Sequence, residues 1–156
     1  MLKKMIKIMM LLSIIVMTIS SCATFAQVSG PVRYVRVLSF EGISKDDIYS
    51  RVRLWISEVQ RHAPLEIDYS DRNAGVIRGH MTVTTNPRTI KQVRSLTTIE
   101  IQEERLRISF TNPIVRSQNN PNARPITMQY DADEVQKAWT SLVNHLNGSV
   151  RRRANW

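Results

Sequence analysis

Apolar residues recur along this chain with two different periods, and each period predicts one kind of element. Between Ser44 and His62 the apolar positions lie three or four residues apart, as on one face of an amphipathic helix; they are Ile48, Val52, Trp55, Ile56 and Val59. Ser44 is a suitable N-cap, and Asp46 and Asp47 place negative charge in the first turn. Pro64 is expected to end this helix.

The helical period returns near the C-terminus. Either Asp131 or Asp133 can cap this second helix, and Gly148 is a suitable C-cap. Its apolar stripe consists of Val135, Ala138, Trp139, Leu142, Val143 and Leu146.

Elsewhere the period is two residues, which predicts strands at 32–40, 65–70, 76–85, 95–102 and 105–110. In the second, Leu65, Ile67 and Tyr69 alternate with Glu66, Asp68 and Ser70. In the third, Ile77, Gly79, Met81 and Val83 alternate with Arg78, His80, Thr82 and Thr84. The first strand alternates imperfectly, so the facing of its side chains stays open. Pro113 is expected to end the last strand, and the Asn-rich stretch 118–122 to form a loop.

The order strand, helix, four strands, helix predicts an α+β fold. We expect an antiparallel sheet of about five strands with two helices on one face, in a single domain over residues 32–148. The other sheet face is then polar or meets a partner. A basic tail over 149–156 has no core to join.

The N-terminus has the features of a secretory signal over residues 1–21. Three lysines precede the apolar run from Ile8 to Ile19, which is shorter than the roughly 20 residues of a spanning helix. Ser20 and Ser21 then lead to Cys22, in a sequence that resembles the bacterial lipobox. Since Cys22 is the only cysteine, it forms no disulfide within the chain, and lipidation gives it a use.

This signal predicts attachment to the membrane through lipid on Cys22, followed by a short linker over residues 22–31. Residue 23 is Ala and not Asp, a pattern similar to outer-membrane sorting, so we expect the domain to face the periplasm. The alternative is ordinary cleavage after Ala26, which gives a soluble periplasmic protein.

The charge balance argues against nucleic-acid binding. The 156 residues contain 22 Lys and Arg against 13 Asp and Glu, a net charge of +9. Loss of residues 1–21 removes three lysines and no acids, and Arg151, Arg152 and Arg153 supply half of the remaining excess. The folded body is therefore only mildly basic, whereas nucleic-acid binders concentrate positive charge on the folded face.

Several stretches between Phe40 and Arg116 resemble a small bacterial family of unknown function with a TATA-binding-protein-like fold. The matching stretches are Ser44-Lys45-Asp46-Asp47-Ile48-Tyr49, Trp55-Ile56, Ile67-Asp68-Tyr69-Ser70-Asp71, Gly75-Val76-Ile77-Arg78-Gly79, Thr98-Ile99-Glu100-Ile101 and Arg105-Leu106-Arg107. The resemblance implies that fold and a cell-envelope context, often with a lipoprotein signal. It implies no catalytic activity, and the name of the fold implies no DNA binding.

The polar sheet face is the first candidate binding surface, for a protein or a glycan. Its candidate residues are Arg78, His80, Thr82, Thr98 and Glu100. The alternative is an ordinary solvent-facing side of an antiparallel sheet.

The C-terminal residues Arg151, Arg152, Arg153 and Trp156 are the second candidate. Arginines bind phosphates, and Trp prefers membrane interfaces, so these residues could contact anionic lipid. The alternative is a solubilising tail.

Catalytic and metal-binding motifs are not found in the sequence. His62, His80 and His145 have no His or Cys at metal-ligand spacing, so no metal or cofactor is expected. The acidic pairs Asp68 with Asp71 and Glu103 with Glu104 lie at turns, where carboxylates usually make local hydrogen bonds.

We therefore expect a non-enzymatic binding module of the cell envelope. One alternative is a hydrolase or inhibitor-like module that acts on an envelope polymer. Another is a structural domain that self-associates through its open sheet face.

Overall fold

The computed structural model describes residues 27–28, 30–85, 91–117 and 120–152. The expected signal peptide, Cys22, the cleavage site after Ala26, Arg153 and Trp156 all lie outside the described residues. Within the described part, no helix combines the length and the apolar character needed to span a membrane.

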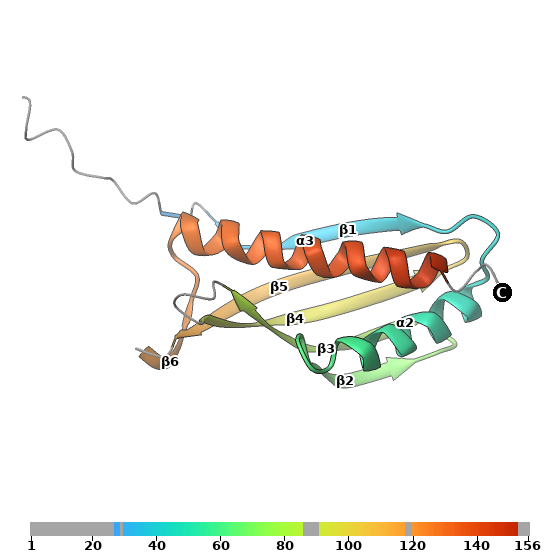
Figure 1. Ribbon diagram of the computed structural model, residues 1–156, viewed down its shortest axis with the longest axis horizontal. Helices are drawn as coiled ribbons and strands as arrows, with labels where there is room; N and C mark the ends of the chain where they lie inside the picture. The colour runs from blue at the N-terminus through green and yellow to red at the C-terminus, as the bar shows by residue number, and fades with distance from the viewer. Residues whose placement is uncertain (1–26, 29, 86–90, 118–119, 153–156) are drawn as a thin grey trace, which may run out of the picture.

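Six strands and two helices make up the domain (Figure 1). In chain order they are β1 (Tyr34–Ser39), α2 (Lys45–Val59), β2 (Leu65–Asp71), β3 (Val76–Thr85), β4 (Lys91–Gln102), β5 (Arg105–Ser117), β6 (Asn120–Pro125) and α3 (Gln129–Arg152). The sheet is antiparallel with the order β1-β5-β4-β3-β2. This confirms the expected α+β class.

The sixth strand was not expected, and it lies beside β5. Strand β1 pairs with β5 from Arg105 to Phe110, and β6 pairs with β5 from Ile114 to Ser117. The two strands therefore share one edge of β5, one after the other. The first three residues of β6 belong to the Asn-rich stretch 118–122 that was expected to form a loop, and 120–125 contains two prolines and no apolar alternation that would predict a strand.

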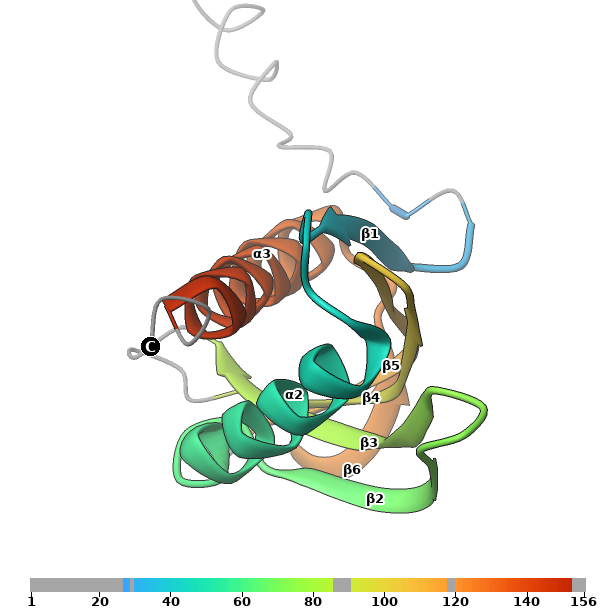
Figure 2. The same ribbon diagram turned by 90° about the vertical axis from the view of Figure 1, so that its right-hand side faces the viewer.

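Both helices lie on one side of the sheet, against its concave face (Figure 2). The two tryptophans occupy the centre of the core: Trp55 of α2 and Trp139 of α3 are fully buried. The ring of Trp139 stacks on Phe110 of β5 with centroids 5.2 Å apart. Both rings belong to the apolar stripes that predicted the helices, and these stripes face the sheet.

The predicted start of α2 is confirmed in detail. The hydroxyl of Ser44 accepts a hydrogen bond from the backbone N–H of Asp47 at 3.2 Å, as an N-cap does. The helix ends at Val59, three residues earlier than expected, and a turn follows in which the carbonyl of Val59 accepts the N–H groups of His62 and Ala63.

Pro113 does not end β5, which is a correction to the sequence prediction. It lies beside Asn112, whose φ of +50° belongs to the left-handed region, in a bulge opposite Ser95. The bulge absorbs the missing N–H of the proline, and the strand continues to Ser117.

A second bulge reverses the facing of Tyr69. The register of β2 against β3 shifts between Ile67 and Tyr69. Tyr69, which was expected on the apolar side, is therefore half exposed. Ser70 is also exposed, but its hydroxyl lies on the helix side, 2.6 Å from the hydroxyl of Tyr49 in α2. A bulge shifts the two-residue period by one, so every later side chain changes face.

The expected tail from residue 149 is also corrected. Helix α3 passes through Gly148 and continues to Arg152, and both Ser149 and Val150 are buried. Val150 continues the stripe four residues after Leu146, and its carbonyl accepts a hydrogen bond from Arg51 at 2.8 Å.

Candidate functional site

The convex side of the sheet carries no helix, and we call it the open face. The alternation of buried and exposed residues, together with the strand register, assigns its side chains. They include Val35 and Val37 on β1; Arg105, Arg107, Ser109 and Thr111 on β5; Gln92, Arg94, Leu96, Thr98, Glu100 and Gln102 on β4; Val76, Arg78, His80, Thr82 and Thr84 on β3; and Glu66, Asp68, Tyr69 and Asp71 on β2.

The candidate residues of the polar face lie where the pattern placed them. Arg78, His80 and Thr82 alternate along β3, and Thr98 and Glu100 lie on β4. The register puts Arg78 directly opposite Thr98. It does not bring Glu100 to either of the basic candidates, because Glu100 is opposite Val76 in β3 and Arg107 in β5.

Charged side chains of the open face pair across neighbouring strands. The guanidinium of Arg107 forms a salt bridge with the carboxylate of Glu100, with N and O 2.5 Å apart. The guanidinium of Arg94 forms one with the carboxylate of Glu66 at 2.6 Å. His80 Nδ1 lies 2.9 Å from a carboxylate oxygen of Asp68 without the angle of a hydrogen bond. These pairs are largely exposed, so each stabilises the fold by about 1 kcal/mol or less.

One row of directly opposed residues crosses the sheet between these pairs, and we call it the central row. It runs Val35, Ser109, Thr98, Arg78, Tyr69 from β1 to β2. Arg78 forms no salt bridge with any described residue. The row thus combines a free guanidinium with a half-exposed tyrosine, two residue types that dominate binding energy at protein interfaces.

Tyr69 and Asp71 form a local pair at the β2 end of this row. The hydroxyl of Tyr69 donates to the carboxylate of Asp71 at 3.2 Å, and the negative charge of Asp71 raises the pKa of Tyr69 above its usual value. The pKa of Asp71 is lowered, chiefly because the backbone N–H of Ala74 donates to its carboxylate at 2.9 Å.

Three residues of the open face were missed by sequence reasoning. Val35 and Val37 were ambiguous because β1 alternates imperfectly, and their pairing with Ser109 and Arg107 now assigns them to the open face. Tyr69 was assigned to the wrong face because a bulge has no simple sequence signal. By contrast, the alternation in 105–110 already separated Arg107 from the core residues.

The remaining turn acids hold the fold together. Glu104, with φ of +57° in the β4–β5 turn, accepts the N–H of Gly42 at 2.9 Å. Glu103 accepts the N–H of Lys45 at 3.1 Å, at the start of α2. Each carboxylate therefore has a structural role, since one ties the β4–β5 turn to the loop before α2 and the other binds the first N–H of that helix.

A groove of about 570 Å³ lies between α2 and α3 and contains two histidines. It is lined by Glu58, Val59, His62, Ser141, Leu142, His145 and Arg152. The indole N–H of Trp55 donates to Nδ1 of His145 at 3.0 Å, which leaves only Nε2 for other contacts. No three His, Cys, Asp or Glu side chains among the described residues lie close enough to hold a metal ion.

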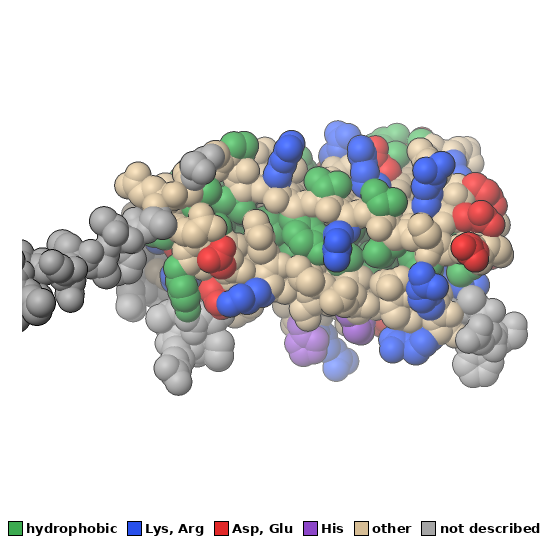
Figure 3. Space-filling view, turned by 90° about the horizontal axis from the view of Figure 1, so that it is seen from above, with side chains coloured by type: hydrophobic (Ala, Val, Ile, Leu, Met, Phe, Trp, Pro, Cys, Tyr) green, Lys and Arg blue, Asp and Glu red, His purple; other side chains and the backbone are tan. Residues whose placement is uncertain are grey.

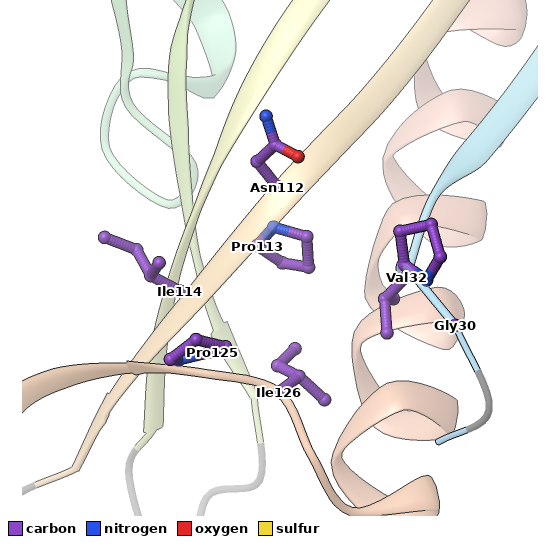
Figure 4. A pocket seen from close by; sticks show the side chains of 8 residues that line it. Gly30, Val32, Asn112, Pro113, Ile114, Pro125 and Ile126 are labelled. Carbon is purple, nitrogen blue, oxygen red and sulfur yellow. The ribbon is translucent and has the colours of Figure 1, made fainter.

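An apolar recess of about 330 Å³ lies where β1 and β6 meet the middle of β5 (Figure 4). Its walls are the residues before β1, the Asn112–Pro113 bulge, and Pro125 and Ile126 at the end of β6. Figure 4 shows their side chains gathered around the point at which neither β1 nor β6 covers β5. The recess is small and offers few polar groups to orient a ligand.

The C-terminal candidate residues are partly used by the fold. Arg151 donates to the carbonyl of Ser39 at 2.9 Å and lies over the ring of Phe40 at 5.6 Å. Arg152 lines the groove between the helices. The expected phosphate-binding cluster is therefore divided between two sides of α3, because successive helical residues point about 100° apart.

The model of the DUF4468 family, described as a domain of unknown function with TBP-like fold, matches residues 34–115. No curated protein matches the chain.

Crystal structures of similar fold include the following two. One is a TBP-like protein from Parabacteroides distasonis, with a TM-score of 0.59 and 14% identity over 81% of this chain and 97% of its own. The other is a DUF4468 family protein from Bacteroides ovatus, with a TM-score of 0.58 and 12% identity over 86% and 92%. At such identities the likeness shows the fold alone, whereas the family model matches more than half of the sequence. The chain therefore belongs to the DUF4468 family of domains with a TBP-like fold.

Proposed function

We propose that this protein is a non-enzymatic binding module whose open face recognises a protein partner along the central row. The observation that carries the proposal is the composition of that row, in which Arg78 has no salt bridge to a described residue and Tyr69 is half exposed. The charges on either side are already paired and can form a polar rim. Four carboxylates on the same face disfavour a nucleic-acid backbone.

Photocrosslinking in intact cells tests this proposal directly. A photoreactive residue replaces Thr98 at the centre of the row, and a matched one replaces Gln136 on the exposed side of α3. We expect a discrete protein-sized adduct from position 98 only, reduced at least about fivefold by Arg78→Ala or Tyr69→Ala. Equal labelling at both positions would contradict the proposal, and an adduct of twice the mass would assign the face to self-association.

We further propose that lipid on Cys22 anchors the module to the outer membrane with its domain in the periplasm. The support is the lysine-rich start, the short apolar run and the single cysteine that follows it. We expect Cys22→Ser to abolish incorporation of an alkyne-labelled fatty acid and to release the protein from the membrane fraction. A processed, unlabelled protein that begins at Gln27 would instead establish cleavage after Ala26.

A further inference from the structure

The outer edge of β1 is a surface distinct from the open face. Strand β1 pairs only with β5, so one of its two edges borders no strand among the described residues. The N–H of Phe40 donates to the carbonyl of Glu104, on the β5 side. Because peptide groups alternate along a strand, the N–H and C=O groups of Val35, Val37 and Ser39 point away from β5.

The contact of Ser39 agrees with this direction. Its carbonyl is the acceptor for Arg151 of α3, at the end of the strand. No strand of the described part pairs with Val35 and Val37 on this side, and the two residues are 49% and 58% exposed. The free edge therefore offers two outward-pointing peptide groups flanked by apolar side chains, which is a template for an added strand.

The opposite edge of the sheet, β2, has features that prevent another strand from pairing with it, namely a bulge and several acidic side chains. Strand β1 has neither. Strand β2 is interrupted by the bulge before Tyr69 and carries three acidic side chains, Glu66, Asp68 and Asp71. Bulges and charges of this kind prevent edge-to-edge pairing. Strand β1 pairs with β5 in an unbroken register over its whole length.

Charge determines which occupant fits the free edge. Arg33 and Arg36 are exposed, the strand contains no acid, and Arg151 lies at its end. A second copy of this chain would bring the arginines of two β1 strands together, which is unfavourable. In a segment that alternates acidic and apolar residues, the carboxylates would lie beside Arg36 on one face of the sheet. The apolar side chains would lie beside Val35 and Val37 on the other face. Figure 3, which views the side formed by β1 and α3, shows Lys and Arg side chains spread along a hydrophobic band.

We propose that the free edge of β1 binds an extended acidic segment of a partner protein, which adds a strand to the sheet through backbone hydrogen bonds to Val35 and Val37. The site goes beyond the central row, because it uses backbone groups at the sheet edge and needs neither Arg78 nor Tyr69.

The test measures binding of a fluorescent ten-residue peptide of alternating Glu and Val to the full chain in detergent, by fluorescence anisotropy. The decisive variant is Val37→Pro, which removes an outward N–H while leaving the bonds to β5 intact. The matched control is Val37→Thr, which keeps the N–H. We expect Val37→Pro to weaken binding about tenfold and Val37→Thr to change it less than about threefold. Arg36→Ala should weaken binding about threefold and reduce its salt dependence.

Other readouts keep the proposal falsifiable if Val37→Pro does not fold. In the unaltered protein, the amides of Val35 and Val37 should become protected from hydrogen exchange when the peptide is added. Unprotected amides, equal binding of a Lys–Val peptide, or equal binding by a folded Val37→Pro variant would overturn the proposal. A concentration-dependent doubling of mass that Val37→Pro abolishes would assign the edge to a second copy. Arg78→Ala should leave peptide binding unchanged, which separates this outcome from failure of the proposed open-face function.

Discussion

The two faces of this sheet are made by alternate residues of the same strands, yet they are stabilised in different ways. On the covered face, Ile77, Ile99 and Ile108 are fully buried beneath the two helices. On the open face, the residues next to these in the chain are accessible to solvent: Arg78 and Arg107 are exposed, and Thr98 is half-buried. The comparison shows that one face holds the fold together while the other is free to change, which is where a binding function can reside.

Removal of a core ring should break the covered face most severely. Trp139→Ala, and likewise Trp55→Ala, should lower the free energy of unfolding by about 3–5 kcal/mol, because each ring is fully buried and leaves a cavity. Chemical denaturation measures the loss. Thr98→Ala on the open face is the control and should change stability by less than about 0.5 kcal/mol. Equal effects would refute the assignment of the two faces.

Two salt bridges allow the faces to be compared with the same chemistry. Asp131 is 5% exposed and binds Lys91 at 2.5 Å, where α3 begins and β4 starts. Asp131→Asn should cost about 2–3 kcal/mol, since it leaves a partly buried ammonium without its charge partner.

The exposed counterpart is Glu100, which binds Arg107 on the open face. Glu100→Gln should cost about 1 kcal/mol or less. Denaturation at low and high salt measures both variants, and only the Glu100 effect should shrink markedly in high salt. A Glu100 effect as large as that of Asp131 would show that the open face also holds the fold together.

The same substitution at two glycines should give opposite signs. A Cβ on Gly79 would lie 2.1 Å from the carbonyl oxygen of Glu66 in β2, so Gly79→Ala should destabilise by about 1–3 kcal/mol. At Gly148, within α3, the nearest atom is the far end of Arg152 at 3.8 Å. Gly148→Ala should therefore stabilise by about 0.5–1 kcal/mol. Thermal denaturation of both variants measures the two effects. A Gly79→Ala variant more stable than the unaltered protein would contradict the close approach of β2 to β3.

The smallest expected effect is the pH dependence of stability caused by Asp71, at the β2 edge of the open face. Because folding lowers the pKa of Asp71, its carboxylate stabilises the protein above its unfolded pKa, and this contribution is lost as the pH falls through the folded pKa. Asp71→Ala should thus be less stable than the unaltered protein at pH 7, and the gap should close in acid. In a Tyr69→Phe background, Asp71→Ala should still cost most of this stability at pH 7. The reason is that the N–H of Ala74 lowers the pKa of Asp71 more than the hydroxyl of Tyr69 does. A gap that stays constant down to pH 2 would refute this linkage.

Much of the fold could be predicted because local patterns and tertiary structure agree. Both helical stripes and the facing of β3 and β4 follow from periods of apolar residues, the cap follows from the hydroxyl of Ser44 before the first turn, and the structure confirms each. The class of fold followed from the order of these elements, and the candidate residues of the polar face share one face for the same reason. The burial of Val150 could also have been predicted, since it continues the stripe of α3.

By itself, the sequence determined which residues are apolar at which period, and therefore the helices, most strands and the two faces of β3 and β4. Only the tertiary structure decided the exposure of Tyr69, the passage of β5 through Pro113 and the free edge of β1. These features depend on a bulge or on which strand lies beside which. Period is a property of neighbours along the chain, whereas register and edges arise from pairing between segments far apart in it.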